Sequence, residues 1–111
     1  MRTVSGHILV PEETAGQAKV VTIEIRDVSI ADAPSTVLAS QTLRNVAFAA
    51  NAPIRFSLKA PEAPGRRLAL RVQVDGASTP GRTAATYLTT QSIDVKSEGD
   101  VTALEAPLTA I

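Results

Sequence analysis

Apolar and polar residues alternate with a period of two along two segments, 19–28 and 67–75. In the first, Val21, Ile23 and Ile25 are separated by polar residues, and in the second every other residue from Leu68 to Val74 is a large aliphatic. Successive side chains of a β-strand point to opposite faces, so this pattern gathers the large apolar side chains on one face. We therefore predict two strands, each with one buried face and one face in water.

Five further segments have alternating or β-branched composition and are separated by turn residues. They span residues 3–10, 37–43, 54–58, 84–93 and 101–108. Asp75-Gly76 and Pro80-Gly81 favour tight turns and predict a loop between them. Apolar residues nowhere recur with the spacing of a helix. We predict an all-β chain, folded as a single-domain Greek-key β-sandwich of about seven antiparallel strands over residues 1–111.

Charge and composition exclude several functional classes. The 11 Lys and Arg residues balance the 11 Asp and Glu residues, and only 3% of the chain is aromatic. Nucleic-acid binding needs a basic surface and stacking aromatic side chains, so we expect no nucleic-acid partner. No apolar run approaches the roughly 20 residues that cross a bilayer, which predicts no membrane span. Without cysteine, thiolate catalysis and cysteine-based zinc sites are excluded.

The single histidine offers little catalytic chemistry. His7 lies on the face of the first predicted strand opposite to Ile8 and Val10. A hydrolytic triad needs a base held beside a nucleophile, and the sequence indicates no partner for His7, so we interpret it as a strand residue that faces water. A hydrolase built on His7 is therefore a weaker hypothesis than the two given below, a cation or small-ligand site and a protein-binding role. The scattered glycines form no phosphate-binding motif, and we predict no cofactor and no enzymatic activity.

The turn at residues 27–34 is where a cation would bind. Asp27 and Asp32 stand near its two ends, and calcium prefers oxygen ligands of this kind. The structural interpretation is stronger, because short Asp and Ser side chains accept hydrogen bonds from backbone N–H groups two residues further on and so shape a loop. We interpret Asp27, Ser29, Asp32 and Pro34 as shape-determining residues. A calcium or small-ligand site in this turn is the alternative.

Three arginines and the single tyrosine complete the candidates. Arg66 immediately precedes the segment 67–75, Arg67 begins it, and Arg71 lies on its polar face together with Arg67. The favoured interpretation of this small basic stripe is pairing with acidic residues of a neighbouring strand, and the other is an acidic partner. Tyr87 lies in a threonine-rich segment, and we expect a buried ring rather than a catalytic phenol.

Several stretches of the chain resemble the YbaY and YscW family of small bacterial lipoproteins. The most specific is residues 21–34, followed by Val37, Leu38, Ala39 and Gln41. Stretches in the order that the family shows then extend the likeness to about residues 4–95: 4–6, 53–56, 68–72 and 87–90. The resemblance implies a β-sandwich envelope protein without a catalytic centre. Some members act as pilotins, which are chaperones that help to place a type III secretion ring in the outer membrane.

The start of the chain departs from the lipoprotein pattern. No cysteine is present to carry a lipid, and the residues after Met1 contain no apolar run typical of a secretory signal. We expect the chain as given to stay in the cytoplasm. If an export segment precedes it in the natural protein, we expect it in the periplasm or at the outer membrane.

The leading functional hypothesis is a non-enzymatic β-sandwich that binds another protein in the manner of a chaperone. An edge strand has unpaired N–H and C=O groups, to which a strand of a partner can add. We expect the last and first predicted strands, residues 101–108 and 3–10, to be the edge strands that offer this surface. Pro107 suits an edge because it cannot donate to a ladder.

Overall fold

A computed structural model of the chain describes residues 1–10, 17–30, 33–47, 53–79, 82–90 and 92–110. These residues form nine strands. The strands are β1 (Arg2–Leu9), β2 (Gln17–Asp27), β3 (Thr36–Ala47), β4 (Ile54–Ala60), β5 (Leu68–Thr79), β6 (Arg82–Leu88), β7 (Ile93–Val95), β8 (Val101–Pro107) and β9 (Thr109–Ala110). The described part of the chain contains no helix long and apolar enough to cross a membrane.

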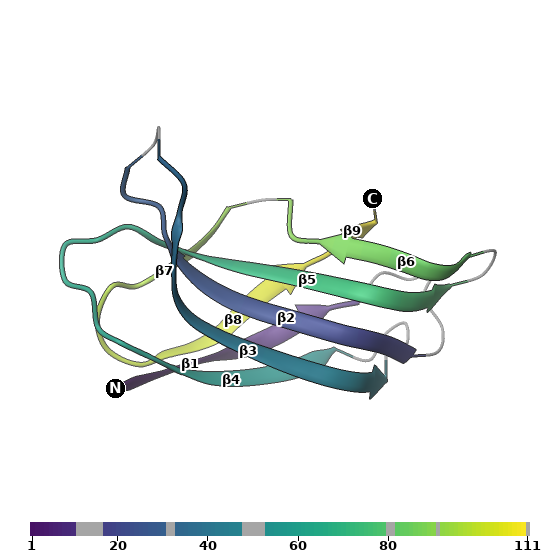
Figure 1. The fold of residues 1–111 in the computed structure, drawn as a ribbon. Helices are drawn as coiled ribbons and strands as arrows, with labels where there is room; N and C mark the ends of the chain where they lie inside the picture. Colours follow the sequence, from purple (N-terminus) through teal and green to yellow (C-terminus); the bar gives the residue numbers. More distant parts are fainter. Residues whose placement is uncertain (11–16, 31–32, 48–52, 80–81, 91, 111) are drawn as a thin grey trace.

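The strands lie in two layers, and the predicted all-β sandwich is confirmed (Figure 1). The smaller sheet has the strand order β4-β1-β8, and the larger has the order β3-β2-β5-β6-β9, with β7 paired to β5 as well. Among the described residues, all strand pairs are antiparallel except β1 with β8, which is parallel. The sandwich therefore contains one long-range parallel pair that the alternation of the sequence could not reveal.

The core fills the space between the two sheets with aliphatic side chains. Its members are inward residues of the alternating segments except 37–43, whose Ala39 and Leu43 are only partly buried and pack against it. Ile23, Ile25 and Val72 are 0% exposed. Phe56 and Tyr87 are the aromatic side chains of this core, and the ring of Tyr87 is buried as predicted. The period-two alternation thus identified the buried face of β2, β4 and β5 correctly, because each apolar position faces the opposite sheet.

Two predicted segments divide into more strands than expected. The segment 84–93 separates into β6 and β7, which pair with different parts of β5. At the C-terminal end, the chain leaves the smaller sheet after Pro107 and continues as β9 in the larger sheet. These breaks account for the difference between the nine observed strands and the expected seven.

Two expected strand ends are displaced. Asp75-Gly76 was expected to end a strand, but β5 continues to Thr79. Gly76 has a φ of 68°, and the ladder with β6 shifts register between Val74 and Ala77, so Gly76 forms a bulge inside the strand rather than a turn. Pro80 and Gly81 lie outside the described residues. Similarly, β3 runs to Ala47 and accommodates Asn45 at a φ of 54°.

The expectation that residues 3–10 form an edge strand is wrong. β1 lies between β4 and β8, with Ile8 paired to Ile54 on one side and to Ala106 on the other. Alternation reports which face of a strand is buried, but the neighbours of β1 come from distant parts of the chain. The other expected edge strand is confirmed, because β8 ends the smaller sheet and Pro107 stands at its end.

Arg2 connects the start of β1 to two loops at one end of the sandwich. Its side chain is only 3% exposed, and its guanidinium donates hydrogen bonds to the carbonyl oxygens of Pro61, Lys96 and Gly99. In addition, the backbone N–H of Thr3 donates to the Asp100 carboxylate over 2.8 Å. A buried guanidinium that binds several carbonyl groups holds this end of the smaller sheet together.

Candidate functional site

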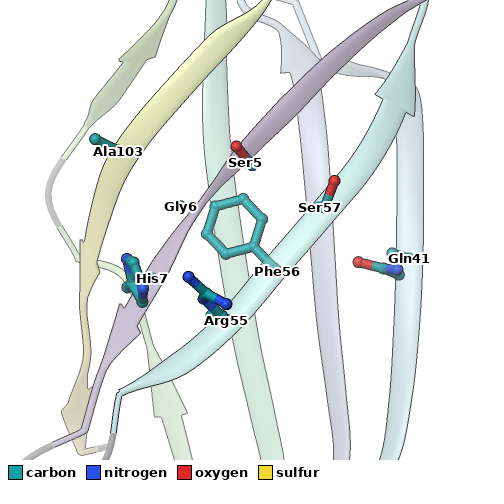
Figure 2. Close-up of a pocket in the computed structure, with 8 residues that line it drawn as sticks. All are labelled: Ser5, Gly6, His7, Gln41, Arg55, Phe56, Ser57 and Ala103. Carbon is teal, nitrogen blue, oxygen red and sulfur yellow. The ribbon is translucent and has the colours of Figure 1, made fainter.

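A hollow of about 680 Å³ lies on the outer face of the smaller sheet, and we call it the outer groove. It crosses from β8 over β1 to β4 and reaches β3 of the larger sheet at its rim (Figure 2). The lining residues are Ser5, Gly6, His7, Gln41, Arg55, Phe56, Ser57 and Ala103. Outward positions of β1 and β4 therefore form its floor, while the same strands bury their other face in the core.

Small residues make the groove. Ser5 of β1 lies directly opposite Ser57 of β4, so the middle of the floor carries only two hydroxymethyl side chains. Next to them, Gly6 lies opposite Phe56, whose ring extends toward β1 in Figure 2 and is almost completely buried. Large side chains at the two serine positions would fill the hollow, so the depression follows directly from the residue sizes.

Gly6 allows β8 to approach β1 very closely. A Cβ atom at this position would lie 2.2 Å from the carbonyl oxygen of Leu104, which is a backbone atom of β8. The parallel ladder shifts register between Val4 and Gly6, and Ala103 there has a φ of 60°. The groove wall on the β8 side is therefore a bulge that only a glycine in β1 can accommodate.

The charges of the outer face are unevenly distributed. His7 stands between Arg55 of β4 and Glu105 of β8, so a cation, an imidazole and a carboxylate form one row across the three strands. Arg55 forms no ion pair with any described residue, whereas the ammonium group of Lys59 donates to the hydroxyl of Thr3 over 2.7 Å. The β4 half of the face is therefore positive and open to an acidic group.

The geometry does not assemble a catalytic triad around His7. The hydroxyl of Ser5 donates to the carbonyl oxygen of Val101 over 3.4 Å. Within the described part of the chain, no hydrogen bond joins His7 to Ser5, Ser57 or Glu105. A triad requires the base to be hydrogen-bonded to its nucleophile and to its orienting carboxylate, so nothing in this arrangement supports the hydrolase hypothesis.

Gln41 supplies an unsatisfied acceptor at the rim of the groove. It lies on β3 opposite Ile23, on the inward face of the larger sheet, and its Oε1 atom is buried without a hydrogen-bond partner. In Figure 2 its carboxamide points from β3 toward β4. Burying an amide oxygen without a donor costs about 1–3 kcal/mol, so an interaction that supplies a donor to Oε1 would recover this free energy.

Asp27 is held by groups of the protein itself. Its Oδ1 accepts a hydrogen bond from the backbone N–H of Ser29 over 2.9 Å, and its Oδ2 pairs with the Arg66 guanidinium over 2.7 Å. The Ser29 hydroxyl accepts from the backbone N–H of Arg67 over 2.8 Å. Asp27 and Ser29 thus connect the end of β2 to the segment that precedes β5, while Pro34 is exposed.

The carboxylate of Asp27 is charged and already bonded to other groups of the protein, so it is not a free ligand for a cation. Hydrogen bonds from Ser29 and then from Arg66 lower the pKa of Asp27 to about 2. The other acidic candidate of the turn, Asp32, lies outside the described residues. Among the residues that the structure describes, no group of three His, Cys, Asp or Glu side chains could hold a metal ion. The calcium site remains a prediction without a supporting contact.

The basic stripe divides between paired and unpaired arginines. Arg66 pairs with Asp27, as the pairing interpretation expected. Arg71 lies opposite Glu24 in the ladder, but Glu24 binds the guanidinium of Arg26 over 3.0 Å instead. Arg71 and Arg26 line a second hollow of about 500 Å³ on the outer face of the larger sheet. The register was therefore favourable for a cross-strand pair, but a neighbour on the same strand competes for the carboxylate.

Several residues of the outer groove escaped the sequence analysis. Ser5, Ser57 and Arg55 occupy ordinary polar positions of alternating strands, and only their pairing across β1 and β4 gathers them. One signal was available, because Gly6 interrupts a strand pattern and such a glycine marks a bulge or a close backbone approach. Gln41 offered no such signal.

Comparisons with known proteins agree with the fold. A family model described as type III secretion system lipoprotein chaperone (YscW) matches residues 1–95. A solved structure of an alternative pilotin from the type II secretion system of Vibrio cholerae superposes with a TM-score of 0.68 at 22% sequence identity, covering 97% of this chain and 96% of that one. No curated protein matches the chain.

Proposed function

Because the chain belongs to the YscW family of type III secretion system lipoprotein chaperones, we propose that it is a non-enzymatic chaperone that binds a protein component of a secretion ring. The observation that carries this proposal is the family match over residues 1–95. The likeness of the whole fold to a solved structure supports it, because that protein is named as a pilotin of a type II secretion system.

The outer groove and the adjoining β8 edge are the docking surface of this proposal. The groove has a floor of small side chains that admits a chain segment, and its hydroxyl, imidazole and guanidinium groups can hydrogen-bond to a peptide. Arg55 lacks an ion-pair partner among the described residues, so the segment that fits is one with a carboxylate near β4. The β8 edge beside the groove can add main-chain hydrogen bonds only over the short stretch between the bulge at Ala103 and Pro107.

The lack of catalytic organisation at the outer face supports a binding role over an enzymatic one. His7 has a carboxylate beside it in the ladder but no bonded nucleophile among the described residues. The chemistry available in the groove is recognition by hydrogen bonds and by the exposed guanidinium of Arg55. Such contacts give specificity and faster association more than raw affinity.

The test is binding to the secretion-ring protein encoded in the same genome, measured by biolayer interferometry with both proteins purified. The informative variant is Arg55→Glu, which reverses the charge at the groove. The matched control is Arg71→Glu, which reverses an exposed arginine on the outer face of the other sheet. We expect R55E to weaken binding about tenfold, equivalent to about 1.4 kcal/mol, and R71E to change it less than about twofold.

Two results would count against this function. Failure of the folded wild-type chain to bind the ring protein would overturn the chaperone role itself. If binding were instead unaffected by R55E but weakened by R71E, the partner would dock on the larger sheet and the outer groove would be excluded. Circular dichroism of each variant establishes that the fold is retained.

A further inference from the structure

The free edge of β3 differs from the other edges of the two sheets. β3 is 12 residues long and ends the larger sheet, and no described strand pairs with its second side. The opposite end of that sheet is the two-residue strand β9. In the smaller sheet, β8 carries a bulge at Ala103 and ends at Pro107, and β4 presents Arg55 and Lys59. Short length, bulges, proline and charge are the devices that prevent edge pairing.

β3 carries few of these devices along its middle. Residues 39–43 contain no charge and no proline, and Val37 near its start is 42% exposed. The unprotected stretch includes Gln41, whose buried Oε1 atom lacks a donor. The ladder of β3 with β2 shifts register at Leu38, and Asn45 has a positive φ, so the unprotected part of this edge is residues 39–43. A stretch of this kind with an unsatisfied acceptor has the properties of a strand that is completed by another strand.

We propose that a second copy of this chain pairs with β3 in antiparallel fashion, centred on Gln41, and so joins the larger sheets of two copies. In this register Gln41 of one copy lies directly opposite Gln41 of the other. Ala39 then lies opposite Leu43, and Ser40 lies opposite Thr42. Inward residues therefore meet inward residues, as a continuous sandwich requires.

The register satisfies the orphan acceptor. Directly opposite residues of an antiparallel pair have Cβ atoms about 4.5–5.5 Å apart, so two carboxamides at this position can exchange N–H···O hydrogen bonds. Once the two carboxamides turn from β4 toward the free edge, each Gln41 Oε1 receives a donor from the other copy, and the two-fold symmetry makes the arrangement reciprocal. A strand from an unrelated protein would need a donor at that one position to achieve the same.

Charge also permits the symmetric pair. Arg44 is the only charged residue of β3. Centred on Gln41, the two Arg44 residues lie six residues apart along the paired strands, which is about 20 Å at the rise of a β-strand. At that separation they are screened from each other at physiological salt. The ladder therefore contains no like charges in direct opposition, which would otherwise destabilise it.

This proposal goes beyond the chaperone function and does not depend on it. One experiment is sedimentation velocity of the purified chain from about 5 µM to about 500 µM, a range that covers the weak dimers expected of a single strand pair. We expect the weight-average sedimentation coefficient to rise with concentration toward that of a dimer. A chain that stays monomeric over the whole range would overturn the proposal.

A second experiment reads the register and uses the absence of cysteine from the chain. The variant Gln41→Cys places two thiols opposite each other at a distance that a disulfide can bridge. The controls are Ser40→Cys, one residue out of register on the same strand, and Thr102→Cys, an exposed position on the β8 edge.

We expect Q41C to form a covalent dimer under mild oxidation at least about tenfold faster than either control, as seen on non-reducing gels. Random collision would favour the exposed T102C, so the order of rates separates specific pairing from chance contact. If T102C cross-linked faster than Q41C, the copies would not meet at β3 and the inference would be wrong. Equal rates for Q41C and S40C would exclude the register.

Discussion

Replacing Gly6 with alanine tests how closely β8 packs against β1. A Cβ atom at residue 6 would lie 2.2 Å from the Leu104 carbonyl oxygen and 2.8 Å from the Leu104 carbonyl carbon. Non-bonded carbon atoms rest about 3.5–4.0 Å apart, so β8 would have to move by about 1 Å. The clashing atoms are the carbonyl group and the Cβ of Leu104, whose positions the backbone fixes, so no side-chain rotation can relieve the clash.

The expected cost follows from two opposing effects. Overpacking of this kind costs about 1–3 kcal/mol, and the loss of one or two ladder hydrogen bonds near Leu104 adds about 1 kcal/mol each. Against this, Gly6 has no positive φ, and alanine in a strand would otherwise gain up to about 1 kcal/mol over glycine. We therefore expect G6A to lower the free energy of unfolding by about 2–3 kcal/mol.

Urea unfolding followed by far-ultraviolet circular dichroism measures this change. With an m value of about 1.5 kcal/mol/M, the midpoint should fall by about 1.3–2 M. The control Ser5→Ala, on the outward face of the same strand, should stay within about 0.5 kcal/mol. Hydrogen exchange of G6A should accelerate in residues 101–106 before residues 21–25. An unchanged or raised midpoint for G6A would refute the close approach of β8.

Four further predictions concern the loops and the bulge. Arg2→Met should lower the free energy of unfolding by about 2 kcal/mol in urea, because the partly buried carbonyl oxygens of Pro61 and Lys96 lose their donor. Asp27→Asn should flatten the pH dependence of stability: the pKa of Asp27 is lowered from 3.8 to about 2, so its contribution is present above about pH 4 and lost as the pH falls toward 2, and a wild-type slope there equal to that of D27N would contradict this. Ala103→Gly should raise stability by about 0.5–1 kcal/mol, since the φ of 60° strains alanine, and a lower urea midpoint would argue against that strain. Millimolar calcium should leave the melting temperature unchanged because both carboxylate oxygens of Asp27 are engaged, and a rise would revive the cation site.

The turn and the groove show how far sequence reasoning reached toward the candidate site. Asp27 and Ser29 were identified because an Asp side chain bonds to the backbone two residues on, which is a local interaction. Its partner Arg66 is 39 residues away, and no local pattern could choose it. Likewise, Ser5 and Ser57 look like ordinary polar strand positions, and they became a groove floor only through the pairing of β1 with β4.

The sequence by itself determined the class of fold and the inward face of the strands with the clearest alternation, β2, β4 and β5. This was possible because a strand exposes its faces in strict alternation, so the side chains of β2, β4 and β5 report their own burial. The tertiary structure alone decided which strands are neighbours: that β1 is central rather than at an edge, that β8 runs parallel to it, and that β3 pairs on only one side among the described residues. Strands pair through backbone N–H and C=O groups, which are the same at nearly every residue, and the paired residues lie far apart along the chain. The side-chain pattern of one strand therefore does not indicate which strand it will pair with.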